Sequence, residues 1–512
     1  MASSENLEIQ VARGTGFLAM RGLFSNLAGL VYFIIATRVL TREEMGSITS
    51  LFVYANFFSF LLAFALPQTV TRFVAEFEGS RRFGAIKLLF RKTVPMVFVF
   101  SAIIALSFLL IGLRFFKTLF GVNDILPVVF ASGFAAVSLL SQYFLAFLLG
   151  LRFYGLYALY TLIGATLTAV FRVGFLWGRV AGVMLGFLLG AFVTFILAFK
   201  KVRVLFSDLP LGDTNFSVRS LFTFALPLYL SNIVVFLRTN LDKILIQWLM
   251  GFRALGVYSV VIALLQAITV FATAVNQAIY PAMSSIYGKG GKGSLGEAFK
   301  KSSRYIYLVF TPLAFGLAAL ASPVVFLFAG PLYEEGAVIL AIASLTWGCF
   351  SLIIPASSSL LALGKSRYVL YASITGVIGE FLTGILLIRW LGYLGVGLTI
   401  FSSTFFLLVT LLYFSRREKI FNVELRDILF PLIGSITMFF TVFSLGFVLG
   451  RILWVVIGIP LGAAIYIIML RIFRIVRRED LVLAEKLLPP GIKSLITIAE
   501  KVLLNETKRP LR

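Results

Sequence analysis

Six charged side chains lie inside stretches that are otherwise apolar, and with these residues the chain could do chemistry. They are Arg21, Arg172, Arg238, Asp242, Lys243 and Glu380. A charge at the centre of a bilayer costs about 2.5–3.5 kcal/mol on insertion scales, so each is a functional hypothesis by default. Because most of the set is cationic, it favours an anionic ligand over a cationic one.

Cationic residues within apolar stretches suit the binding of a phosphate. Arginine matches the geometry of a phosphate with paired N–H groups. We interpret Arg21, Arg238, Lys243 and Arg172 as candidates for lining a cavity and contacting a substrate phosphate. For Arg21 and Arg172, the alternative is that the side chain reaches out to the lipid headgroups.

Two carboxylates are candidates for ion coupling or gating. Asp242 lies four residues after Arg238, so the two can pair on one helical face. Glu380 lies in the middle of an apolar run, where a carboxylate needs a proton or a cationic partner. Either residue could bind H⁺ or Na⁺. The alternatives are a structural ion pair and a hydrogen bond between packed helices.

Neutral polar residues in the same stretches suggest a wet interior. Ser25 and Asn26 follow Arg21 by about one turn, and Gln266 and Gln277 are eleven residues apart, close to three turns. We interpret them as polar lining of a cavity. Hydrogen bonding between helices is the alternative for each.

The composition excludes several classes of protein. The chain has 512 residues, of which 60% are hydrophobic and 13% charged, whereas soluble domains are about 45–50% apolar and 25% charged. It has no His and one cysteine, Cys349. Catalysis that depends on His and an internal disulfide are therefore excluded, and we expect neither a metal nor a cofactor.

The hydropathy pattern predicts an all-α integral membrane protein. A span needs about 20 apolar residues. About fourteen runs satisfy this: 15–37, 46–69, 94–113, 126–149, 155–176, 182–199, 221–246, 256–280, 305–329, 336–361, 369–388, 395–414, 428–450 and 452–470.

The net charge of +23 is explained by topology. If the N-terminus is cytoplasmic, Lys and Arg on the inner side outnumber those on the outer side by about four to one, which is the asymmetry that orients membrane proteins. The pattern predicts cytoplasmic termini and a multi-pass protein of the cell membrane, and gives no reason to expect nucleic acid.

The chain also carries a weak internal repeat. Residues 42–46 (REEMG) precede the second run and 252–256 (FRALG) precede the eighth, about 210 residues later. Six spans separate the copies, which predicts a parallel repeat about an axis along the membrane normal. The expected parts are an N-terminal lobe, a C-terminal lobe, two additional spans and a basic cytoplasmic tail: 1–200, 201–415, 416–470 and 471–512.

Several stretches resemble polysaccharide-exporter flippases of the Wzx type, within the multidrug/oligosaccharidyl-lipid/polysaccharide (MOP) superfamily. They occur in the family's order along the chain: 35–46 (IATRVLTREEMG), 241–245 (LDKIL), 255–259 (LGVYS), 361–365 (LALGK) and 392–397 (GYLGVG). The resemblance implies two six-helix lobes around a central cavity, with two extra C-terminal helices. Glu380 departs from it, because the family more often has Asn or a small residue there.

The resemblance implies a monomeric flippase and not an enzyme. It would move an oligosaccharide on a polyprenyl or dolichyl phosphate or pyrophosphate across the cytoplasmic membrane by alternating access, for polysaccharide or glycoconjugate synthesis. Two alternatives stay open. One is an ion-coupled multidrug exporter of the same superfamily, which would need a more acidic cavity. The other is a membrane-embedded glycosyltransferase or polymerase, which would need paired carboxylates or a metal.

Overall fold

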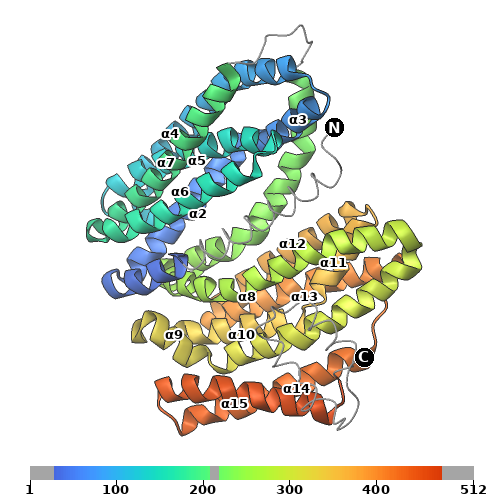
Figure 1. Cartoon of the computed structure of the whole chain (residues 1–512). Coiled ribbons are helices and arrows are strands. Elements are labelled where there is room, and N and C mark those ends of the chain that lie inside the picture. Colours follow the sequence, from blue (N-terminus) through green and yellow to red (C-terminus); the bar gives the residue numbers. More distant parts are fainter. Residues whose placement is uncertain (1–27, 208–217, 476–512) are drawn as a thin grey trace. The chain divides into compact units, whose positions relative to one another are not determined.

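The computed structural model describes residues 28–207 and 218–475, and in these ranges the chain forms helices and no strand (Figure 1). A helix over Ala28–Val39 comes first. The next helices are α2 (Arg42–Ala63), α3 (Leu66–Gly79), α4 (Phe83–Phe120), α5 (Leu126–Gly150), α6 (Tyr154–Gly174), α7 (Arg179–Ser207) and α8 (Val218–Ala319). The last are α9 (Ala321–Ala329), α10 (Ala337–Cys349), α11 (Ile353–Ala362), α12 (Ser366–Leu391), α13 (Tyr393–Arg417), α14 (Leu425–Ser444) and α15 (Arg451–Ile472).

The predicted fold class is confirmed. Among the described residues, 10 helices are long and apolar enough to cross a membrane, or up to 12 if each of two bent pairs is one span. One of them, Arg219–Gln266, has 48 residues, about twice the length that a span needs. The predicted runs fall on helices, although 46–69, 305–329 and 336–361 each extend over two helices with a break between them. The first run begins in residues outside the described ranges.

Helix α8 is one continuous helix of 102 residues, which would measure about 150 Å if it were straight. Its backbone departs from helical geometry at two glycines. Gly251 has a φ of +83° and Gly291 a φ of +67°, a left-handed conformation that glycine adopts at little cost. These two positions explain how one helix contains the seventh and eighth predicted runs and the first part of the ninth, whose remainder lies on α9.

The chain divides into two compact units. The first contains residues 1–270 and 380–396, and the second contains 271–379 and 397–512. The first part of α8 and the end of α12 therefore pack with α2–α7. The division into lobes at 1–200 and 201–415, which would move in alternating access, stays a prediction. The assignment of 416–470 as two additional spans and of 471–512 as a cytoplasmic tail also stays a prediction.

Helix α5 is central to the first unit. Over its most apolar stretch, 72% of its residues are buried, against 17% for α6. Small residues such as Ala131, Ala135 and Ser138 line its buried faces, which lets neighbouring helices approach closely. A helix held this firmly can present polar side chains with a fixed geometry.

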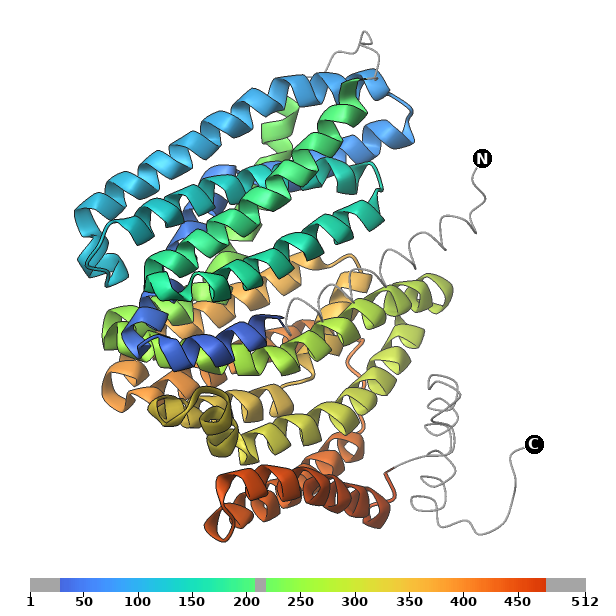
Figure 2. The same cartoon turned by 60° about the vertical axis from the view of Figure 1, so that its left-hand side comes forward.

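In the second unit, α14 and α15 lie side by side (Figures 1 and 2). The Trp454 indole N–H donates to the carbonyl of Val442 at 2.7 Å. The Tyr466 hydroxyl donates to the carbonyl of Leu308 on α8 at 2.8 Å. The first bond therefore ties α15 to α14, and the second ties α15 to α8.

The two repeat motifs meet inside the first unit. A Cβ built on Gly46 would lie 1.9 Å from the carbonyl oxygen of Phe252. A Cβ built on Gly256 would lie 1.8 Å from the carbonyl oxygen of Arg42. Each glycine thus contacts the backbone that precedes the other, and the repeat itself stays a prediction.

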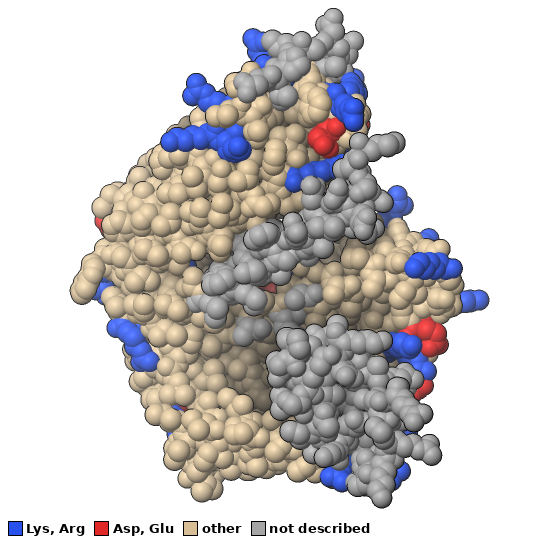
Figure 3. Space-filling model, in the orientation of Figure 1, with Lys and Arg blue, Asp and Glu red and all other residues tan. Residues whose placement is uncertain are grey.

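The surface carries few charges. Figure 3 shows one face on which large uncharged areas separate the Lys and Arg side chains. Exposed apolar residues such as Leu106, Leu386 and Val456 occur along the middles of helices. An apolar surface of this kind suits contact with lipid.

Candidate functional site

A polar cavity of about 340 Å³ opens between α2, α3, α5 and the first part of α8, all within the first compact unit. None of the described residues that line it is charged. The lining is polar or aromatic for the most part: Asn56, Ser59, Gln68, Gln142, Asn232, Thr239 and Asn240, with Phe52, Phe60 and Phe236. Small and apolar residues complete it: Ala63, Ala65, Pro67 and Leu139.

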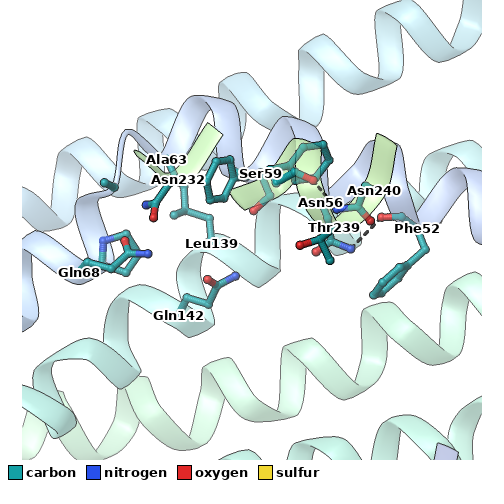
Figure 4. A pocket seen from close by; sticks show the side chains of 14 residues that line it. Phe52, Asn56, Ser59, Ala63, Gln68, Leu139, Gln142, Asn232, Thr239 and Asn240 are labelled. Atoms are coloured by element: carbon teal, nitrogen blue, oxygen red, sulfur yellow. Dashed lines mark hydrogen bonds between the residues drawn. The ribbon is translucent and has the colours of Figure 1, made fainter. Parts of the chain in front are cut away.

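The amides of the cavity fall into two groups (Figure 4). Asn56 donates to the Phe52 carbonyl at 2.7 Å, and Asn240 donates to the Phe236 carbonyl at 3.1 Å. Gln68, Gln142 and Asn232 have no hydrogen-bond partner among the described residues. Gln68 and Gln142 are exposed and Asn232 is half-buried, so their amides are available to water or to a polar ligand.

A break between α2 and α3 shapes one wall of the cavity. Phe64 and Ala65 have left-handed backbones, with φ of 49° and 53°, which cost non-glycine residues about 1–2 kcal/mol each. Pro67 is the second residue of α3, within the first turn, where a proline loses no helical hydrogen bond. The break interrupts the predicted span 46–69 and places Gln68 in the cavity lining.

Aromatic packing positions the first part of α8 against α2 and the α2–α3 break. The ring centroids of Phe60 and Phe236 are 5.8 Å apart, and those of Phe64 and Tyr229 are 4.7 Å apart. Asn232 and Asn240 are eight residues apart on α8, so they lie near one face. The same packing therefore turns both amides toward the cavity.

A charge cluster flanks the cavity within the first unit. Arg238 precedes the lining residue Thr239 and interacts electrostatically with Glu380 on α12. Glu380 is only 5% exposed. Sequence spacing suggested Asp242 as the partner of Arg238, but the described partners of Asp242 are the Lys243 ammonium at 3.2 Å and the Tyr258 hydroxyl.

The remaining predicted site residues lie elsewhere. Arg21, Ser25 and Asn26 are outside the described residues. The guanidinium of Arg172 packs 3.9 Å from the ring centroid of Tyr32 and 4.7 Å from that of Phe187. Gln266 and Gln277 are exposed on α8, one in each compact unit. The proposed roles of these residues stay predictions.

The amides of the cavity were missed by sequence reasoning. Asn56, Gln142, Asn232 and Asn240 all fall within predicted spans. The amides weighed as cavity lining were Asn26, Gln266 and Gln277 and not these four, although each amide in a span carries a desolvation cost. The eight-residue interval between Asn232 and Asn240, which places both amides near one face of a helix, could have identified them as candidates for cavity lining.

Comparison with solved structures places this fold in a known class. The structure resembles "Lipid II flippase MurJ, inward closed conformation" with a TM-score of 0.69 and 16% identity, covering 91% of this chain and 99% of that chain. It resembles an inward-facing multidrug resistance MATE family transporter with a TM-score of 0.63 and 17% identity, covering 78% and 98%. A MOP superfamily transporter from Pyrococcus furiosus matches with a TM-score of 0.56 and 16% identity, covering 79% and 95%.

The chain therefore has the fold that the lipid II flippase and these MOP superfamily transporters share. Residues 11–287 match the family described as "Polysaccharide biosynthesis protein", and residues 227–386 match the MatE family. The first match spans more than half of the sequence, so the chain belongs to the polysaccharide biosynthesis protein family. No curated protein matches it.

Proposed function

We propose that the protein is a flippase for a lipid-linked oligosaccharide on a polyprenyl or dolichyl phosphate or pyrophosphate. The observation that carries the proposal is the neutral polar cavity. Gln68, Gln142 and Asn232 offer amide groups that no described residue uses. Amides both donate and accept hydrogen bonds, as sugar hydroxyls do.

The aromatic lining supports a sugar over a small polar ion. Phe52, Phe60 and Phe236 present flat apolar faces beside the amides. A sugar ring has an apolar face of C–H groups and an edge of hydroxyls, so it matches a wall that combines both. A neutral lining also gives a cationic drug no carboxylate to bind.

A polar passage solves the physical problem of flipping. The head of a lipid-linked sugar is too polar to cross about 30 Å of hydrocarbon, whereas its lipid tail is stable there. A cavity that opens alternately to each side lets the head cross while the tail stays in the bilayer. The family match and the fold of the similar flippase and exporter support this mode of action.

We assign the coupling function to the charge cluster. Glu380 and Asp242 are acidic, and each has a cationic neighbour, Arg238 or Lys243. A proton or Na⁺ that binds one of these carboxylates would change the electrostatic balance next to the cavity. Movement driven by H⁺ or Na⁺ is therefore part of the proposal.

We place the protein in the cytoplasmic membrane, as a monomer with both termini inside. The distribution of Lys and Arg along the sequence supports this orientation. In this orientation the long basic loops face the cytoplasm, where lipid-linked precursors are assembled. We assign the cavity no catalytic step.

The proposal is tested by transfer of a fluorescent polyprenyl-pyrophosphate oligosaccharide across proteoliposomes. We expect transfer that depends on the protein and is accelerated by an imposed H⁺ or Na⁺ gradient. A cationic dye should not be transported under the same gradients. Absence of oligosaccharide transfer together with uptake of the dye would replace the flippase with a multidrug exporter.

A further inference from the structure

A second cavity, of about 650 Å³, lies in the first unit between α3 and the start of α8. We call it the cationic mouth. Its lining residues are Arg72, Phe73, Arg219, Ser220, Thr223 and Phe224. Arg72 comes one helical turn after Gln68, which lines the amide cavity, and one turn is about 5.4 Å. The two cavities are therefore neighbours along α3.

Arg72 is held by aromatic rings. Its guanidinium carbon lies 3.8 Å from the ring centroid of Phe224 and 5.2 Å from that of Phe73. The two rings meet edge to face at 6.1 Å. A guanidinium stacked on a ring keeps its N–H edges free to bind a planar or tetrahedral anion. Glu76 lies 3.8 Å away, but both side chains are about half exposed, so this pair is weak.

The start of α8 adds further donors. Arg219 and Ser220 lie on the first described turn of α8 and line the cavity. Thr223 donates its hydroxyl proton to the Arg219 carbonyl at 2.9 Å, so its oxygen can still accept a hydrogen bond from a ligand. Two guanidinium groups and two hydroxyl groups thus line one cavity.

We propose that the cationic mouth binds the phosphate or pyrophosphate headgroup of an amphiphile. Where the amphiphile is the transported substrate, this inference rests on the proposed function. The sugar then occupies the amide cavity one turn away, and the apolar chain leaves past Phe73 and Phe224. Arg238 lies 19 residues after Arg219 along α8, a distance of about 28 Å if the helix is straight.

The topology read from sequence supports the same assignment. Arg72 belongs to the loop region 70–93 and Arg219 to 200–220, and both were predicted on the cytoplasmic side. The structure brings these two residues, distant in sequence, into one cavity. A flippase that loads from the cytoplasm would meet the headgroup of its substrate at this side first.

The experiment measures binding of farnesyl pyrophosphate to the full-length protein in phosphatidylcholine nanodiscs. The variants are Arg72→Gln, Arg219→Gln and the double change. Arg82→Gln is the matched control, because Arg82 also packs on a ring, 5.2 Å from the Phe77 centroid, yet does not line the cavity. Thermal unfolding of each variant checks that it is folded.

We expect each cavity variant to weaken binding about tenfold, which corresponds to 1.4 kcal/mol. The control should stay within about twofold, and binding of the uncharged alcohol farnesol should not depend on either arginine. Wild-type affinity for farnesyl pyrophosphate in the folded double variant would overturn the proposal.

Two further arms separate the possible outcomes. If phosphatidylglycerol in the nanodiscs abolishes arginine-dependent binding, the anion is a membrane-lipid headgroup; if it does not, the anion is the substrate's pyrophosphate. Arginine-dependent binding without oligosaccharide transfer by wild type would uphold the cationic mouth and sink the proposed function. Oligosaccharide transfer by wild type together with arginine-independent binding of farnesyl pyrophosphate would uphold the proposed function and overturn the cationic mouth.

Discussion

At the scale of single residues, Arg238 and Glu380 define the electrostatics beside the cavity. Glu380 is buried on α12, and Arg238 is the cation on α8 with which it interacts. A buried carboxylate that loses its cation must take up a proton or remain as an uncompensated charge. The pair therefore links the protonation of Glu380 to the position of α8.

Removing the charge of Arg238 alone should lower stability more than removing the charges of both Arg238 and Glu380. We expect Arg238→Ala to lower stability by roughly 1–3 kcal/mol, less than the 3–5 of a fully buried pair because Arg238 has exposed surface. Adding Glu380→Gln should restore part of the loss. Thermal unfolding of the single and double variants in one detergent measures the coupling. Strictly additive effects would show that the two charges do not interact.

Some of this site could be predicted from the sequence. Arg238, Asp242 and Glu380 were identified as charges within apolar runs, and the structure brings all three into one unit. The pairing was not predictable, because spacing along α8 favoured Asp242 and only the fold brings α12 close. The sequence suggested other amides, Gln266 and Gln277, because spacing along one helix cannot show which face of that helix meets a cavity.

At the scale of elements, the break between α2 and α3 and the crossing of α2 with α8 shape the first unit. The capping box at Thr41 and Glu44 starts α2, and the TREE sequence at 41–44 is typical of such a start. Just inside this start, Gly46 contacts the backbone of Phe252. The crossing of the two helices thus depends on the absence of a side chain.

Adding a methyl group at this crossing should disrupt it. Gly46→Ala or Gly256→Ala would place a Cβ within 2 Å of a carbonyl oxygen, and overpacking of this kind costs about 1–3 kcal/mol or more. Gly155→Ala on α6 is the control, because nothing lies within 4 Å of its Cβ position. We expect lower unfolding temperatures for the first two variants and an unchanged unfolding temperature for the control. Equal stability of all three would contradict the close crossing.

A salt bridge between the ends of two elements gives a pH dependence. The hydrogen bond from the Lys292 ammonium, at 2.7 Å, holds the pKa of Glu418 below its ordinary value. A lowered carboxylate pKa stabilises the fold above the unfolded pKa of about 4.3 and stops doing so as the pH falls through the folded value. The effect is small because Lys292 is half exposed.

Lys292→Ala tests this contribution. We expect a slightly lower unfolding temperature than wild type at pH 7, and a difference that shrinks as the pH falls and Glu418 becomes protonated in both proteins. Glu418→Gln serves as the control, because it should remove the same pH dependence. A difference between wild type and Lys292→Ala that grows at low pH would contradict the assignment.

The elements themselves could be predicted far better than their breaks. Long apolar runs placed every span, because each must satisfy its backbone internally within the membrane. The break at Phe64 and Ala65 was not predicted, since neither residue favours a left-handed backbone. Only packing in the folded unit can impose such a conformation, and this break places Gln68 in the cavity.

At the scale of the whole molecule, the account describes a transporter that separates two tasks. In our proposal, the amides and aromatic rings of the cavity receive the sugar, and the cationic mouth receives the phosphate. The charge cluster at Arg238 and Glu380 would link ion binding to the movement. The sequence predicted an anionic substrate from its internal cations, whereas the described cavity is neutral and the cations flank it.

The most direct test is the initial rate of oligosaccharide transfer in proteoliposomes containing Gln142→Leu, Asn232→Leu or both. Leucine keeps the approximate size of each side chain and removes its hydrogen bonds to the sugar. Asn422→Leu is the control, because Asn422 donates to Glu297 at 2.9 Å and lies outside the cavity. We expect the double variant to transfer more than about tenfold slower, from the loss of two or more hydrogen bonds of 0.5–1.5 kcal/mol each, and the control to match wild type. Wild-type transfer by the folded double variant would contradict the claim that this cavity is the passage for the sugar.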